Sequence, residues 1–140
     1  MIRVVLDTNV LVSAAVFGGK PDEILDLARG GKIQLCTSPE LLAEFGGVLA
    51  RKLGFPPELT DEALAEVASL AAIVEPRHKL NVISQDDADN RVLECALAGR
   101  VGYVVSGDSH LRALRVFRRI PILSPSAFLD ESLWLLGADE

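Results

Sequence analysis

The sequence predicts an α/β fold in which helices surround a central parallel sheet. Short apolar runs of strand length alternate along the chain with segments of helical periodicity, which is the pattern of successive βαβ units. The first run, residues 2–6, carries no charge after Arg3, as expected for a strand that is buried on both faces. No repeat or internal boundary interrupts the 140 residues, so we expect one domain over residues 1–140.

Turn and capping residues divide the first half of the chain into separate elements. Glycine pairs follow two of the helical segments, Ser38-Pro39 opens a third, and Thr60 is expected to cap a fourth. Strands are expected at 2–6, 33–36 and, as a short edge strand, 72–74, whereas helices are expected at 10–17, 21–29, 39–53 and 59–71.

The second half begins with a segment of no clear period, residues 77–85, which we interpret as a loop. Gly99 ends the helix that follows it, and Ser124-Pro125 starts the last helix. Helices are expected at 88–98, 109–115 and 125–136, and strands at 103–105 and 120–123.

Composition limits the classes of function. The net charge of −6 argues against a protein that holds nucleic acid by bulk electrostatics, but metal-binding carboxylates contribute negative charge, so a nuclease is not excluded. The basic residues Arg112, Arg115, Arg118 and Arg119 lie close together and are interpreted as a solvated surface.

Two further observations concern location. Cys36 and Cys95 are the only cysteines and lie in apolar runs, so we expect two buried, reduced thiols and a cytoplasmic protein. The longest apolar stretches have strand length and no secretion signal is evident, so we expect neither a membrane span nor a membrane partner.

Two acidic residues follow apolar strands directly. Asp7 comes after the strand at 2–6, and Asp108 comes shortly after the strand at 103–105. In open parallel sheets the ligand crevice lies outside the carboxyl ends of the strands, so neighbouring strands would bring both carboxylates to one crevice. The alternative interpretation is that each residue only caps the helix that follows it.

Two more acids lie on helix faces that otherwise carry apolar residues. Asp89 shares its face with Val92, Leu93 and Ala96, and Glu44 lies at the edge of another apolar stripe. The alternatives are a first-turn cap at Asp89 and an ordinary boundary residue at Glu44. Asp86 and Asp87 are better cap candidates than Asp89.

A metal site would account for these four acids. Buried carboxylates that converge repel one another unless a cation is present, and oxygen ligands without a His or Cys cluster favour Mg²⁺ or Mn²⁺, as one or two ions. Such sites act on phosphates, which suits hydrolysis of a phosphodiester. Thr8, Asn9 and Ser106 are candidates to orient a carboxylate, a water or a phosphate, with turn and capping roles as the alternative. The exposed positions expected for Asn90 and Arg91 suit contact with substrate or simple solvation, and His110 is interpreted as helix surface.

Four segments resemble the PIN-domain family. They are Val-Val-Leu-Asp-Thr-Asn-Val-Leu at 4–11, Ser-Pro-Glu-Leu-Leu-Ala-Glu at 38–44, Asp-Asn-Arg-Val-Leu-Glu at 89–94 and Val-Val-Ser-Gly-Asp-Ser-His-Leu at 104–111. Each motif is modest alone, but four in this order and separation are specific. Within the family, the chain is most similar to the VapC-like ribonucleases that are the toxins of toxin–antitoxin pairs.

The resemblance implies a three-layer α/β/α fold with a central parallel sheet of four to five strands. It also implies Mg²⁺- or Mn²⁺-dependent cleavage of RNA, with the four family acids at Asp7, Glu44, Asp89 and Asp108. The expected partners are an RNA substrate, a small cognate antitoxin and a second copy of the chain in a homodimer. The apolar residues 133–136 would serve either protein contact or pack on the sheet. Gly46-Gly47 lies inside the helix that carries Glu44, so that helix is expected to be bent or closely packed.

The main alternative is a catalytically inactive PIN-like module that binds RNA or a protein through the same groove. Retention of all four acids disfavours it, because without metal they would only destabilise the fold. A haloacid-dehalogenase type requires an aspartate where the chain has Asn9, and a receiver domain requires a lysine beyond Lys79. A dinucleotide-binding domain requires a glycine fingerprint that the first turn lacks.

Overall fold

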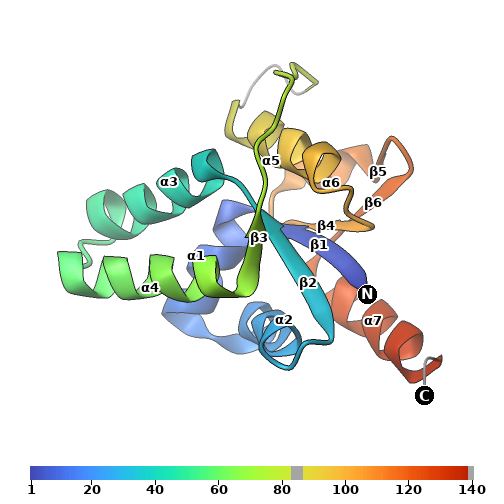
Figure 1. The fold of residues 1–140 in the computed structure, drawn as a ribbon, viewed down its shortest axis with the longest axis horizontal. Coiled ribbons are helices and arrows are strands. Elements are labelled where there is room, and N and C mark those ends of the chain that lie inside the picture. The colour runs from blue at the N-terminus through green and yellow to red at the C-terminus, as the bar shows by residue number, and fades with distance from the viewer. Residues whose placement is uncertain (83–86, 139–140) are drawn as a thin grey trace.

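A computed structural model describes residues 1–82 and 87–138 and shows helices on both sides of a twisted sheet (Figure 1). The sheet has six strands within the described residues. In spatial order they are β3 (Ala71–Ile73), β2 (Ile33–Thr37), β1 (Ile2–Leu6), β4 (Tyr103–Val105), β6 (Ile120–Leu123) and β5 (Val116–Phe117). The pairs from β3 through β6 are parallel, and β5 pairs with β6 in the antiparallel direction. The α/β class with a central parallel sheet is confirmed, but the expected four to five strands omit β5. A two-residue strand is too short to show a period.

Seven α-helices and one π-helical turn lie within the described residues. They are α1 (Thr8–Phe17), α2 (Gly19–Arg29), α3 (Pro39–Gly47), the π-helical η1 (Val48–Lys52), α4 (Pro57–Leu70), α5 (Asp87–Ala98), α6 (Ser109–Leu114) and α7 (Pro125–Ala138). Each expected helix is present with small shifts of its ends. Thr60 is not a cap, because α4 begins three residues earlier and the Thr60 hydroxyl donates to the carbonyl oxygen of Pro56 instead. Asp86, the side chain of Asp87 and the side chains of residues 133–136 lie outside the described part, so their expected roles stay predictions.

Two apolar clusters lie on opposite faces of the sheet. Val4 and Leu6 belong to one cluster, with side chains from α1, α2, α4 and α7, whereas Val5 belongs to the other, with side chains from α5 and α6. Successive residues of a strand point to opposite faces, and β1 lies between β2 and β4, so it is covered on both sides. The result is the three-layer arrangement, and it explains why β1 carries an uncharged run.

The sheet places its ligand crevice at the end of β1. The chain moves from β1 outward to β2 and β3, and then returns to the other side of β1 to form β4. The order of the strands therefore reverses between β1 and β4, whose carboxyl ends lie side by side in the register Leu6 to Val105. The connections leave in opposite directions there and open a crevice, which is where such sheets bind ligands.

One of the two glycines in α3, Gly46, lies where the helix is closely packed, one of the two outcomes expected from the sequence. A Cβ atom on Gly46 would lie 3.1 Å from Cδ1 of Leu64, so α3 and α4 pack closely at this position. The α-helix ends at Gly47, and the π-helical turn η1 continues it as far as Lys52. The expected helix 39–53 is therefore one α-helical segment followed by a widened turn. Glu44 lies in the regular part, in the turn before this change.

Candidate metal centre

Asp7 directly follows β1 and is buried, with 3% of its surface exposed. Its backbone N–H donates to the carbonyl oxygen of Val105 at 3.0 Å, which fixes it beside the end of β4. Its Oδ1 accepts from the N–H of Val10 at 2.9 Å, and its Oδ2 accepts from the hydroxyl of Ser106. Asp7 therefore caps α1, as the alternative interpretation states, and also lies in the crevice. The two roles are compatible because each uses a different oxygen.

Burial raises the pKa of the Asp7 carboxyl above its usual range, and the nearby Asp108 carboxylate adds to this increase. The hydrogen bonds from Ser106 and Val10 act in the opposite direction, but they do not cancel the effect of burial. The ionised form of Asp7 is thus disfavoured in this fold. A cation in the crevice would reverse that balance.

Asp108 lies at the start of α6, and its side chain is 22% exposed. Its Oδ1 accepts from the N–H groups of His110 and Leu111, at 2.7 and 3.2 Å, so it caps the helix. Its own N–H donates to the hydroxyl oxygen of Ser106 at 2.9 Å. Ser106, which is fully buried, therefore connects the two acids that follow β1 and β4.

All four acids predicted from the sequence line one small cavity of about 40 Å³, together with Thr8 and Asn9. Asp89 reaches it from α5 and is 6% exposed, and the half-buried Glu44 reaches it from α3. This cavity has room for a small ion and for water. Four segments that are far apart in the sequence thus meet at one point.

His110 was missed by sequence reasoning as a candidate ligand. Asp89, Asp108 and His110 each offer one ligand atom within 4.8 Å of the others, which makes them a possible metal-binding group. The Nδ1 atom of His110 lies 3.7 Å from Oδ1 of Asp108, while 58% of the His110 side chain is exposed. The interpretation as helix surface is right about exposure but overlooks this proximity. The available signal was the position of His110 in the first helical turn, two residues after the capping Asp108.

The donor set suits a hard divalent cation. Carboxylate oxygens dominate the cavity wall, with one imidazole nearby, which favours Mg²⁺ or Mn²⁺ over soft metals. The hydroxyl oxygen of Thr8 is buried and has no hydrogen-bond partner among the described residues. A buried hydroxyl of this kind is normally satisfied, so an ion-bound water or a phosphate oxygen would complete its bonding. The residues present therefore fit a divalent ion.

Asn90 and Arg91 are not exposed, contrary to the sequence-based expectation. Asn90 is fully buried, and its Oδ1 accepts from the N–H of Val82 at 2.9 Å. Arg91 forms an ion pair of 2.8 Å with the buried Glu94 and donates to the carbonyl oxygen of Leu80 at 3.3 Å. Both side chains fasten the segment 80–82 to α5. Periodicity alone did not show this, because the segment that covers α5 has no period of its own.

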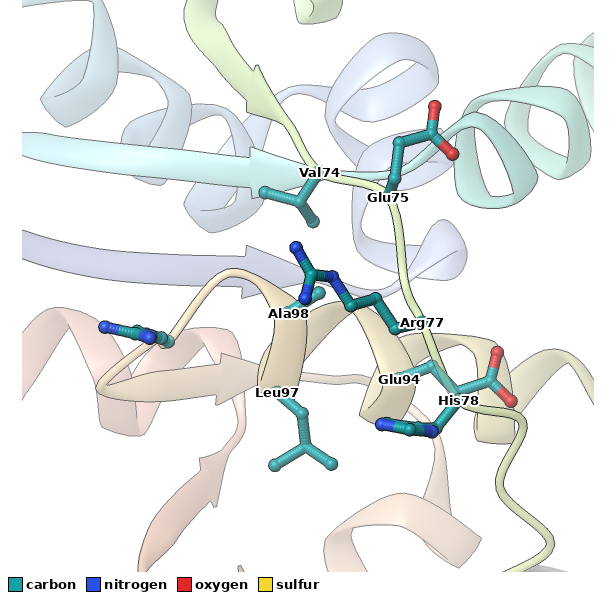
Figure 2. A pocket seen from close by; sticks show the side chains of 8 residues that line it. Val74, Glu75, Arg77, His78, Glu94, Leu97 and Ala98 are labelled. Carbon is teal, nitrogen blue, oxygen red and sulfur yellow. The ribbon is translucent and has the colours of Figure 1, made fainter.

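A larger cavity lies elsewhere on α5. It has a volume of about 580 Å³ between α5 and the segment that follows β3, and Figure 2 shows Arg77 and His78 on that segment with Glu94 on the helix. Its acids do not gather: Glu94 is engaged by Arg91 and by the N–H of Leu80, and the other acid that lines it is Glu75. The smaller cavity is thus where carboxylates converge, although it is not the largest.

The geometry defines a class of protein: a three-layer α/β protein with a carboxylate pocket at the point where the strand order reverses. A family model of the PIN domain matches residues 3–110. The chain therefore belongs to the PIN domain family, as its four motifs predict. PIN domains are in general metal-dependent nucleases and usually bind a divalent metal.

The chain is also similar to one further protein sequence and to two solved structures. Protein MJ1680 of Methanocaldococcus jannaschii is 34% identical over 146 residues, which cover 93% of this chain and 91% of that protein. The structure of VapBC2 from Rickettsia felis bound to a DNA fragment from their promoter superposes with a TM-score of 0.63 and 16% identity, and covers 86% of this chain and 97% of that one. The structure of PAE2754 from Pyrobaculum aerophilum superposes with a TM-score of 0.65 and 15% identity, and the match covers 94% of this chain and 90% of that one. At these identities the two structures show a shared fold.

No helix among the described residues is long and apolar enough to cross a membrane. Cys36 and Cys95 are free thiols and both are buried.

Proposed function

We propose that this protein is a Mg²⁺- or Mn²⁺-dependent endoribonuclease and the toxin of a toxin–antitoxin pair. The observation that carries the proposal is the convergence of Asp7, Glu44, Asp89 and Asp108 on one small cavity at the carboxyl ends of β1 and β4. Membership of the PIN domain family supports nuclease chemistry.

In this proposal the four carboxylates hold one or two divalent ions, with Asp89, Asp108 and the nearby His110 as the closest group. When bound, such an ion lowers the pKa of a water molecule and offsets the charge that develops on the phosphoryl oxygens. The carboxylates supply the negative charge that retains the ion.

The polar neighbours have separate roles. Ser106 orients Asp7 by donating to its Oδ2, and the N–H groups of α6 hold Asp108. The unsatisfied hydroxyl of Thr8 and the exposed amide of Asn9 are placed on the cavity wall where they would bond a phosphate oxygen or a water. Asn90 and Arg91 bond the segment 80–82, so we assign them a role in holding α5, the helix that carries Asp89, instead of contact with substrate.

The choice of an enzyme over an inactive binding module rests on the cost of burial. Asp7 and Asp89 are both nearly inaccessible to solvent, and burying carboxylates near one another is unfavourable without a cation. A module that binds RNA or protein alone gains nothing from keeping them.

The partners follow from the same proposal. One structure with a similar fold is VapBC2, which supports a small antitoxin partner for this chain. We also propose that the protein forms a homodimer. We propose a cytoplasmic location as well, because buried free thiols are typical of a reducing compartment.

The direct test is cleavage of structured and unstructured RNA by the purified protein with Mn²⁺, with Mg²⁺ and with chelator. We expect Asp7→Asn and Asp108→Asn each to abolish metal-dependent cleavage while the protein stays folded. Asp61→Asn is the matched control, because it makes the same exchange at an exposed position on α4. Cleavage at the wild-type rate in either pocket variant, or undiminished cleavage in chelator, would exclude the proposal.

A further inference from the structure

Arginine occupies every left-handed backbone position that a non-glycine residue holds in the described part of the chain. The four residues and their φ angles are Arg100 at 50°, Arg115 at 61°, Arg118 at 47° and Arg119 at 68°. Side chains with a Cβ atom disfavour this region, where glycine and asparagine are usual. Such positions are often kept for function, so their common identity requires an explanation.

Three of these arginines lie around the hairpin of β5 and β6. Arg118 and Arg119 form a two-residue turn between the paired residues Phe117 and Ile120. Positive φ at both central residues is the mark of a type I′ turn, for which Asn-Gly is strongly preferred. The guanidinium of Arg118 lies 5.3 Å from the centroid of the Phe117 ring, which holds it in place. The turn thus presents two arginines at positions where the backbone conformation favours neither.

This part of the chain is also charged unlike the rest. No acidic residue occurs from Ser109 to Leu129, although the whole chain has a net charge of −6. The exposed arginines in it, called here the arginine surface, are Arg112, Arg115, Arg118 and Arg119. None of them forms an ion pair with a residue that the structure describes. Their charge is therefore available to a partner.

The arginine surface extends from the acidic cavity toward the opposite edge of the sheet. The helix α6 follows its N-cap residue Asp108 directly and carries Arg112 in its last turn. The N–H of Ile122 donates to the carbonyl oxygen of Arg115 at 2.9 Å, and the N–H of Ser106 donates to that of Leu123 at 2.9 Å. Strand β6 thus has the hairpin turn at its amino end and Ser106, which contacts the cavity acids, at its carboxyl end, over roughly 13 Å at 3.3 Å per residue. Figure 1 shows β5 and β6 beside α6 at the edge of the sheet.

We propose that the arginine surface binds the phosphodiester backbone of RNA and directs the strand into the acidic cavity. This inference rests on the proposed function and identifies where that substrate lies. An acidic protein requires a local positive surface to hold a polyanion, and guanidinium groups bind phosphate with two parallel hydrogen bonds. The spread of four arginines along a helix, a loop and a turn suits a repeated phosphate chain better than a single small anion.

The test is binding of a fluorescent single-stranded RNA, measured by anisotropy in chelator so that no cleavage occurs, over a series of salt concentrations. The variant Arg118→Asn/Arg119→Gly places the preferred residues in the type I′ turn, so we expect its melting temperature to be equal to or above that of the wild type. We expect its RNA affinity to fall about five- to tenfold, and the slope of log K against log salt to become shallower by about 1.4, or 0.7 for each lost phosphate contact.

The control Lys20→Gln/Lys32→Gln removes the same charge from exposed positions on and after α2 and should bind RNA nearly as the wild type does. Arg112→Gln, an exposed helix substitution with no backbone strain, should also weaken binding and make the slope shallower. Unchanged affinity and slope in both arginine variants, or an equal loss in the control, would overturn the proposal. So would weakened capture of an acidic antitoxin peptide together with normal RNA binding.

The two proposals fail in different ways. If the wild type cleaves RNA with Mn²⁺ but both arginine variants bind RNA normally, the proposal for the arginine surface fails and the nuclease assignment stands. If the hairpin variant loses RNA binding but the wild type does not cleave with any metal, the reverse holds.

Discussion

The hydroxyl of Ser106 donates to Oδ2 of Asp7 and accepts from the N–H of Asp108, so one buried side chain links the acids that follow two neighbouring strands. Ser106 and Asp7 are separated by 99 residues in the sequence. The link is possible because β1 and β4 are parallel neighbours, with Leu6 beside Val105. The geometry of the cavity is therefore set by sheet pairing and fixed by a serine that bears no charge.

Ser106→Ala should weaken metal binding, although it leaves the charge of the site unchanged. The hydrogen bond from Ser106 lowers the pKa of Asp7, so loss of this donor disfavours the ionised form of Asp7 that binds metal. Removing a residue that hydrogen-bonds a metal ligand typically lowers metal affinity by about 10- to 100-fold. Calorimetric titration with Mn²⁺ measures the affinity of each protein, and Ser106→Thr is the control variant that keeps the hydroxyl. Equal affinity in wild type and Ser106→Ala would contradict this role.

Divalent metal should stabilise the fold, and Asp7→Asn should remove that effect. At a metal concentration about 100 times Kd, binding contributes about 2.7 kcal/mol, which corresponds to a rise of about 5–10 °C in Tm for a domain of this size. Without metal, Asp7→Asn should melt at a higher temperature than the wild type, because burial disfavours the charge that the amide lacks. Thermal melts with Mg²⁺, with Mn²⁺ and with chelator test both statements. If the Tm of the wild type does not change when metal is added, that result would count against the metal site.

The pairing of Glu94 with Arg91 should hold the segment 80–82 on α5. Glu94→Ala leaves the largely buried Arg91 without its ionic partner, which typically costs about 3 kcal/mol, whereas Glu94→Gln keeps an acceptor for the N–H of Leu80 and should cost less. Urea unfolding gives the free energies, and hydrogen exchange at the Leu80 amide gives the local effect. If the amide of Leu80 stays equally protected in Glu94→Ala, the fastening role is wrong.

Stability should fall in alkaline solution because of Cys95. Burial, with a smaller contribution from Cys36, raises the pKa of the Cys95 thiol from 9.0 to about 12. In the unfolded chain the thiol ionises first as the pH rises, so the free energy of unfolding decreases between pH 9 and 12 by about 1.4 kcal/mol per pH unit. Urea unfolding in reducing buffer at pH 8 and pH 10.5 should show a smaller decrease for Cys95→Ala. Parallel decreases in the two proteins would assign the effect to other groups.

The parts of the fold that depend on local pattern were predictable. The ends of β1 were predicted correctly, because a short uncharged apolar run between Arg3 and Asp7 is typical of a buried strand. The four acids that line the cavity were selected as candidates because a carboxylate on an apolar face, or directly after a buried strand, is costly to bury. Both features can be read within ten residues of sequence.

Other features required the tertiary structure. The strand β5 exists because β6 offers it a partner, and its two residues have no pattern of their own. Asn90 and Arg91 are covered by a segment that has no period, so their burial was not evident. His110 is close to Asp89 only because α5 and α6 pack on the same face of the sheet.

The sequence by itself determined the order of strands and helices, the chemistry of the donors and the family to which the chain belongs. These follow from short-range preferences and from which residues tolerate burial. Only the tertiary structure decided that the donors share one cavity, that Ser106 connects two of them and that exposed arginines with positive φ lie around the hairpin of β5 and β6. Distances between remote side chains depend on strand pairing and helix packing, which no local pattern records.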